Sequence, residues 1–202
     1  MENTKAAFER FFKLYHKFCV QPDLDSVFNL MNAIHSLNDR LNNSINENFF
    51  KSEEFISIKA LRNLFHHQDE LLNELRIIPA EKLPPITTDL LYLCLVPKYL
   101  VEASFEHIPN KYRKEQEGII RSTLKWYGEV VNIYPCIFNF SVKVFEKAKS
   151  LVLELDSNEY KEFEASYEFE TENGHSHFAN GDINCHAGSV TEILKIAFAN
   201  IA

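Results

Sequence analysis

Glycine and proline are scarce in this chain of 202 residues, with five and seven copies. β-Sandwiches and barrels need many tight turns, which these residues commonly form, so their scarcity argues against both architectures and favours long helices. Cysteine is also rare, and its four copies lie at least 42 residues apart without a Cys-x-x-Cys pair. Such spacing is typical of a reduced, cytoplasmic chain rather than of a disulfide framework.

Long apolar runs are missing as well. The richest one, 90–96, is seven residues long and stands between Asp89 and Lys98, whereas a membrane span needs roughly 18 such residues. The first residues combine aromatic side chains with Glu2, Glu9 and Arg10, which does not match the apolar core of a signal peptide. We therefore expect a cytoplasmic protein that has no membrane partner.

Negative charge is concentrated in one segment. Of the net charge of -8, the segment 154–172 carries -7, from eight acidic residues and Lys161, so the other residues sum to -1. A strongly acidic chain would disfavour nucleic acid as a partner. Here the remainder of the chain is nearly neutral, and a locally basic cleft for nucleic acid stays compatible with the composition.

Most of the chain has the pattern of amphipathic helices, because apolar residues recur every three or four positions. Asp23 and Asp25 are candidate N-caps of one helix, and Ser52, Thr87 or Thr88, and Ser189 could begin others. Pro97 should kink the helix that contains it. The expected helices cover 5–20, 23–45, 52–78, 87–105, 110–135, 138–155 and 189–202.

The acidic segment shows a different pattern. Aromatic and small residues alternate with four glutamates and Ser166 over 162–171, a period of two that predicts a half-exposed strand. Asn173-Gly174 and Asn180-Gly181 are turn signals, so a short β-hairpin is expected. The glutamates would protect an edge strand from aggregation. The alternatives are that they mimic a nucleic acid or form an electrostatic dock for a basic partner.

The resulting fold prediction is all-α: a bundle of five to seven helices with a short acidic β-hairpin near the C-terminus. Residues 1–155 would form the helical bundle. Residues 156–202 would supply the acidic hairpin and a final helix, packed on the same domain.

The strongest candidates for catalytic residues lie in the segment 62–67, Arg-Asn-Leu-Phe-His-His. At about 100° per residue, Arg62, Asn63, His66 and His67 fall within about 140° of one another on one side of a helix. An arginine fork binds phosphate oxygens, an imidazole moves protons near neutral pH, and an amide can orient its neighbours. This polar stripe therefore suits the chemistry of a phosphodiester.

Arg-Asn-x-x-x-His in a long helix of an all-α chain resembles the HEPN superfamily (higher eukaryotes and prokaryotes nucleotide-binding). Many members are metal-independent endoribonucleases of toxin–antitoxin, phage-defence and CRISPR systems, and their site usually forms across a dimer. The resemblance implies an RNA substrate, a homodimer, no cofactor and a possible antitoxin or other protein partner. It also implies that Arg62 holds the scissile phosphate, that Asn63 orients the site and that His67 is the acid or base.

Two alternatives stay open for this motif. One is a non-catalytic HEPN-like interaction module that binds a protein partner or a nucleotide. The other is a solvated helix face on which Arg62 pairs with Asp69 or Glu70. If the chain is a nuclease, His66 competes with His67, because it lies one turn from Arg62. On the preceding helix, the candidate supporting residues are Asn32, Ser36 and Asp39.

A second group of residues follows the acidic segment. His175, His177, Cys185 and His186 could in principle supply four zinc ligands. However, Cys185 and His186 are adjacent in sequence and would be strained on one ion, so we expect a polar turn without metal.

Overall fold

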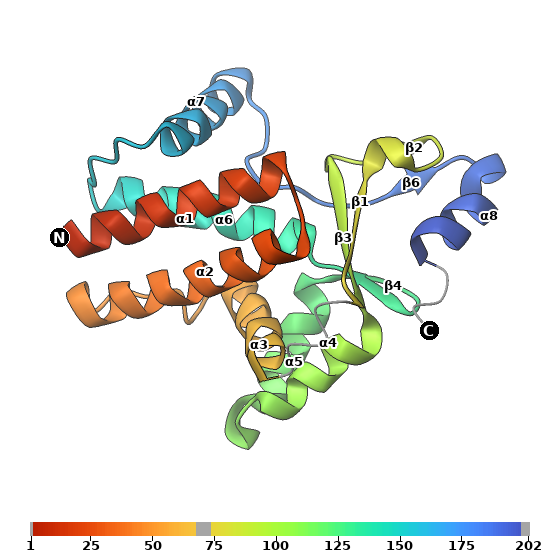
Figure 1. Ribbon diagram of the computed structural model, residues 1–202, viewed down its shortest axis with the longest axis horizontal. Helices are drawn as coiled ribbons and strands as arrows, with labels where there is room; N and C mark the ends of the chain where they lie inside the picture. Colours follow the sequence, from red (N-terminus) through yellow and green to blue (C-terminus); the bar gives the residue numbers. More distant parts are fainter. Residues whose placement is uncertain (1, 68–73, 199–202) are drawn as a thin grey trace. The chain divides into compact units, whose positions relative to one another are not determined.

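The computed structural model describes residues 2–67 and 74–198, with only the backbone of His67 (Figure 1). The chain divides into two compact units: unit 1 comprises Met1–Phe55 and Phe138–Phe178, and unit 2 comprises Ile56–Ile137 and Ala179–Ala202. The chain is mostly helical, as predicted, but the all-α prediction missed a four-stranded antiparallel sheet. No helix among the described residues is long and apolar enough to span a membrane.

Unit 1 is helical. Figure 1 shows its first two helices as an antiparallel pair. The second begins at a capping box: the Asp23 carboxylate accepts a hydrogen bond from the Ser26 amide at 2.6 Å, and the Ser26 hydroxyl accepts one from the Asp23 amide at 2.9 Å. Asp23 is thus the N-cap among the two candidates. The helices that contribute to this unit are α1 (Glu2–Val20), α2 (Leu24–Ile45), α7 (Asn158–Asn173), the start of α3 (Glu53–His67) and most of α6 (Tyr134–Ser150).

Aromatic rings fill the core of unit 1. Phe12 makes edge-on contacts with Phe145 and Phe163 at centroid distances of 6.5 and 5.5 Å, which joins α1 to α6 and α7. Phe140 lies 5.0 Å from Phe49 and 6.5 Å from Phe11. Edge-on ring pairs add to the stabilisation from apolar burial, so the many phenylalanines of the sequence are explained largely by this core.

The acidic segment is a helix, and the predicted strand and hairpin are wrong. α7 begins at the N-cap Ser157, and Gly174, with φ of +68°, ends it rather than turning a hairpin. The rings of Phe163 and Tyr167 pack on Phe145 at 5.2 and 4.7 Å, at helical rather than alternate spacing. Phe169, which completed the alternation, is 60% exposed. Glutamate favours helices and is depleted in strands, which agrees with this outcome.

Unit 2 is built on the four-stranded antiparallel sheet, in the order β1-β3-β5-β4. A separate pair, β2 (Ile86–Thr87) with β6 (Asn184–Cys185), joins distant parts of the chain. The α-helices of this unit are the remainder of α3, α4 (Lys98–Ser104), α5 (Asn110–Thr123) and α8 (Val190–Ile193). It also contains the short 3-10 helices Ala80–Lys82, Phe105–His107 and Ala187–Ser189 and the π-helix Leu194–Phe198. The sheet strands are β1 (Arg76–Pro79), β3 (Tyr92–Pro97), β4 (Lys125–Tyr127) and β5 (Val130–Asn132).

Three predicted helices of this unit are shorter than expected because their ends are strands. The region of 76–78 forms β1 instead of ending a helix, and 92–97 forms the central strand β3. Positions 93–97 are buried, and a short apolar run of this kind does not distinguish a buried strand from a helix. Pro97 ends β3 and precedes α4, so it kinks no helix.

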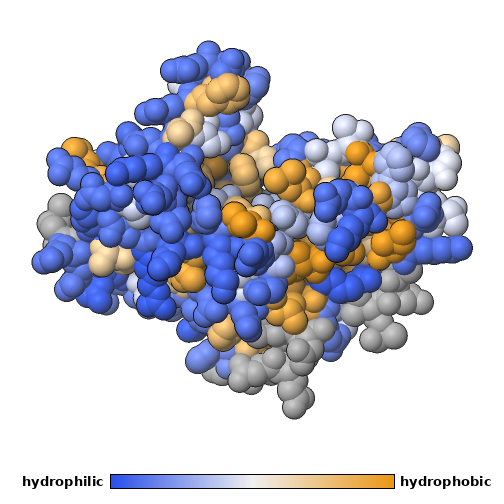
Figure 2. All heavy atoms as spheres, turned by 45° about the horizontal axis from the view of Figure 1, so that its top comes forward, coloured by the Kyte–Doolittle hydropathy of each residue, from blue (hydrophilic) through white to orange (hydrophobic). Residues whose placement is uncertain are grey.

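The third of these helices ends at Thr123, and a hairpin follows. β4 and β5 pair Tyr127 with Val130, which leaves the two-residue loop Gly128-Glu129. Gly128 has φ of +63° at the first loop position, as a Gly-X hairpin turn requires. Figure 2 shows exposed apolar side chains in patches on a mostly hydrophilic surface.

Candidate functional site

The predicted polar stripe lies on α3, within unit 2. Leu61, Leu64 and Phe65 are buried, with exposed fractions of at most 1%. Arg62 and Asn63 between them are half-buried, and His66 is exposed. α3 therefore has one face in the core of its unit and presents the polar residues on the other.

Arg62 and Asn63 are in contact. The Arg62 guanidinium donates from Nη1 to Oδ1 of the Asn63 side chain at 3.4 Å. A guanidinium has five donors, and this contact uses one of them. The amide thus holds the guanidinium on the polar side of α3.

The histidines are less fully described. His66 follows Arg62 by one helical turn, and His67 is the last residue of α3, described by its backbone. Asp69 and Glu70, the proposed ion-pair partners of Arg62, lie outside the described residues.

The three candidate supporting residues belong to α2, in unit 1. Asn32 is half-buried, whereas Ser36 and Asp39 are exposed. The Asp39 carboxylate lies 3.2 Å from Nδ1 of His35, one turn earlier on the same helix. Among the described residues, Asp39 therefore pairs with a residue of its own helix.

The candidate zinc residues make other contacts. Nδ1 of His177 lies 2.8 Å from a Glu170 carboxylate oxygen, in unit 1. In unit 2, Cys185 is exposed in β6, and Nε2 of His186 lies 3.3 Å from the Ser189 hydroxyl. Across residues 2–67 and 74–198, no three His, Cys, Asp or Glu side chains gather in a way that could hold a metal ion.

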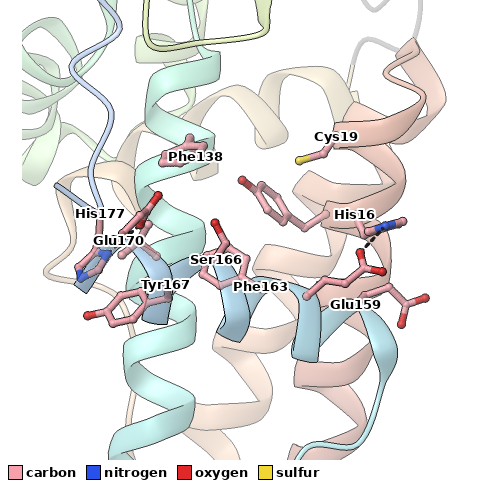
Figure 3. A pocket seen from close by; sticks show the side chains of 12 residues that line it. His16, Cys19, Phe138, Glu159, Phe163, Ser166, Tyr167, Glu170 and His177 are labelled. Carbon is pink, nitrogen blue, oxygen red and sulfur yellow. Dashed lines mark hydrogen bonds and ion pairs between the residues drawn. The ribbon is translucent and has the colours of Figure 1, made fainter. Parts of the chain in front are cut away.

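Unit 1 contains a pocket that the sequence analysis did not anticipate. It has a volume of about 180 Å³ and is lined by side chains of α1, α6, α7 and the segment that follows α7. Figure 3 shows α7 crossing the pocket, with Phe138 of α6 above it. Four rings form its apolar walls: Tyr15, Phe138, Phe163 and Tyr167.

A histidine–glutamate pair stands at each end of the pocket, as Figure 3 shows. At one end, Nε2 of His16 lies 3.0 Å from the Glu162 carboxylate, and the two side chains are 39% and 66% exposed. At the other end, His177 pairs with Glu170, and these side chains are 19% and 26% exposed. The His177 end is therefore the more enclosed one.

The enclosed end is held by several contacts. The His177 ring stacks on Tyr167 at a centroid distance of 3.6 Å, and its Nε2 lies 3.2 Å from the Thr171 hydroxyl. The Tyr167 hydroxyl donates to Glu146 at 3.2 Å. Burial and the nearby Glu146 carboxylate raise the pKa of Tyr167, so its hydroxyl remains a donor.

The sequence does contain a signal for this pocket. Glu159, Glu162, Ser166 and Glu170 are separated by three, four and four residues, which places them on one side of a helix. Reading the segment as a strand concealed that spacing, since alternate residues of a strand point to opposite faces.

Comparisons with protein-family models, curated proteins and solved structures returned no match. Any function therefore rests on the residues and geometry described above.

Proposed function

We propose that this protein is a metal-independent endoribonuclease that uses the polar side of α3, in the manner of the HEPN nucleases that its sequence resembles. The observation that carries the proposal is the 3.4 Å contact between Arg62 and Asn63 on a helix whose opposite face is buried. It orients a half-buried guanidinium on the polar side of a helix that ends at His67.

Arg62 has the chemistry to bind the scissile phosphate. A guanidinium is charged at all relevant pH values, and its planar fork matches two phosphate oxygens. Because the half-buried side chain is anchored by Asn63, it loses less conformational freedom when it binds an anion. It would act most strongly on the transition state, in which negative charge on the phosphate oxygens increases.

The reaction that fits these groups needs no metal. The RNA 2′-hydroxyl attacks the adjacent phosphorus, the bond from phosphorus to the 5′-oxygen breaks, and a 2′,3′-cyclic phosphate and a 5′-hydroxyl result. His67 donates a proton to the departing 5′-oxygen. In the proposed homodimer, two α3 stripes face one cleft, and the imidazole of the second copy accepts the proton of the 2′-hydroxyl.

A cleavage assay tests this proposal. The purified chain is incubated with end-labelled mixed RNA in EDTA, and the ends of the products are identified. We expect cyclic-phosphate ends, a loss of about 10²- to 10³-fold in rate for Arg62→Ala and of about 10²- to 10⁴-fold for His67→Ala. His66→Ala should retain most of the activity.

Matched controls separate loss of the site from general effects of charge. Arg40→Ala removes an exposed arginine of α2, and His175→Ala removes an exposed histidine beyond α7. Both should cleave like the wild type. If folded Arg62→Ala and His67→Ala variants cleave normally, the activity belongs elsewhere. If a confirmed dimer cleaves no RNA, the interaction-module alternative is favoured.

A further inference from the structure

The pocket of unit 1 has the size of a small-molecule site. An apolar cavity of about 150 Å³ is known to hold benzene, so the volume of about 180 Å³ found here suits a ligand of roughly ten non-hydrogen atoms. Its walls are aromatic, and a few polar groups converge on it, which is the usual composition of a ligand pocket.

The charges around the pocket select for a cation. Three carboxylates line it, those of Glu159, Glu162 and Glu170, and its described lining includes neither lysine nor arginine. Glu162 and Glu170 each face a histidine, whereas Glu159 has no charged partner among the described residues. Even with both histidines protonated, one negative charge remains uncompensated.

The carboxylates are spread along the pocket rather than gathered at one point. With a rise of about 1.5 Å per residue, Glu162 and Glu170 are about 12 Å apart along α7, and Glu159 and Glu170 about 16 Å. Figure 3 shows Phe163 and Tyr167 between the two ends. The pocket therefore offers acceptors at both ends and rings between them.

We infer that this pocket binds a linear aliphatic polyamine such as spermidine. Terminal ammonium groups would donate to the carboxylates at the two ends, since a carboxylate accepts several hydrogen bonds and can keep its histidine partner. The methylene chain would lie along Phe163 and Tyr167, the apolar part of the lining between the two ends. The inference concerns unit 1 and does not depend on the nuclease activity proposed for α3.

Isothermal titration calorimetry of the full chain with spermidine at low salt tests the inference. We expect one site per chain and weaker binding of putrescine, which is too short to reach both ends. Glu159→Gln and Glu170→Gln should each weaken spermidine binding by about tenfold, because each removes a charge-assisted hydrogen bond. Glu168→Gln makes the same charge change on α7 away from this pocket and should bind like the wild type.

A second pair of variants tests whether the ligand binds inside the pocket, and neither variant changes the charge of the chain. Ser166→Trp introduces a large side chain into the lining, and Ala165→Trp places the same side chain at the neighbouring exposed position of α7. Ser166→Trp should abolish binding and Ala165→Trp should preserve it, with circular dichroism confirming that both are folded.

Several outcomes would overturn the inference. If Glu168→Gln weakens binding as much as Glu159→Gln, the polyamine binds the acidic helix diffusely. If phenethylammonium binds more tightly than spermidine, the pocket is a monocation site. Absence of binding by the folded wild type also rejects it. Arg62→Ala should bind spermidine normally, so failure of the nuclease proposal and failure of this one are distinguishable.

Discussion

Unit 1 consists mainly of helices of 16 to 22 residues, which pack on one another through aromatic rings. Unit 2 divides a similar number of residues among strands of two to six residues and shorter helices. Apart from its end turns, each helix of unit 1 makes its backbone hydrogen bonds within itself, so its stability depends mainly on side-chain packing. Apart from the β4–β5 hairpin, the strands of unit 2 pair with distant segments, and their stability should respond more to backbone geometry at the connections.

The largest effect should follow from removing a ring of the unit 1 core. Phe12 is 1% exposed and contacts the rings of Phe145, Tyr160 and Phe163. Phe12→Ala should lower the free energy of unfolding by about 3–5 kcal/mol, because it leaves a cavity where three helices meet. Urea unfolding followed by far-UV circular dichroism measures this.

The matched control is Phe169→Ala, which removes an exposed ring from α7. It should change the free energy of unfolding by less than about 0.5 kcal/mol. Equal effects of the two substitutions would contradict the assignment of the unit 1 core.

In unit 2, the largest effect is expected from a substitution at Gly181 that strains the backbone. Its φ is +72°, and a Cβ atom there would lie 2.2 Å from Cγ of Pro135. Its amide also donates to Asp89 at 3.0 Å. Gly181→Ala should therefore lower the free energy of unfolding by about 2–4 kcal/mol, through strain and overlap with a ring. Fluorescence of Trp126, the single tryptophan, located in β4, reports on this unit.

Gly118 provides the opposite expectation. It lies in α5 at an exposed position, and a Cβ atom there would meet nothing within 4 Å. Gly118→Ala should raise the free energy of unfolding by about 0.5–1 kcal/mol, since alanine is the better helix former. If Gly181→Ala also raised the free energy of unfolding, the backbone conformation at Gly181 would not limit the stability of unit 2.

The smallest effect concerns an ion pair in unit 1. Burial alone would raise the pKa of Glu54, but hydrogen bonds from Lys143 and Ser52 outweigh it and hold the pKa below its usual value of 4.5. A carboxyl with a lowered folded pKa contributes stability above its unfolded pKa and loses it as the pH falls through the folded value. Glu54→Gln should thus lower the free energy of unfolding by about 1 kcal/mol at neutral pH.

That difference should shrink as the pH falls below 4.5 and through the lowered pKa of Glu54, where the wild-type carboxyl becomes protonated. Urea midpoints at several pH values measure it. Glu47→Gln removes the carboxylate of a more exposed ion pair, that of Glu47 with Lys147. It should lower the free energy of unfolding by less than about 0.5 kcal/mol. A Glu54→Gln effect that persists unchanged at pH 3 would mean that shape, not charge, stabilises this position.

Much of unit 1 was predictable because its signals are local. The ring spacing of α1, the cap at Asp23 and the apolar stripe of α2 are each contained within one helix, and these helices were predicted nearly to their ends. The same holds for the polar stripe of α3, in which a buried Phe65 and a half-buried Arg62 follow directly from helical periodicity.

The errors arose where two structures share one local pattern. The apolar run ending at Val96 suits a buried helix or a central strand, and only its pairing with β1 and β5 selects the strand. In α7, glutamates and aromatics satisfied a period of two and a helical period at once. Packing of Phe163 and Tyr167 on Phe145 decided in favour of the helix.

By itself, the sequence determined the mostly helical character of this protein, the start of α2 at Asp23, and the placement of Arg62, Asn63 and His66 on one side of α3. Tertiary structure alone decided the central pairings of the sheet, because β3 bonds to β1 and β5, which lie far from it in the chain. It likewise decided the pocket of unit 1, since the walls of a cavity come from several helices and no single segment encodes their meeting.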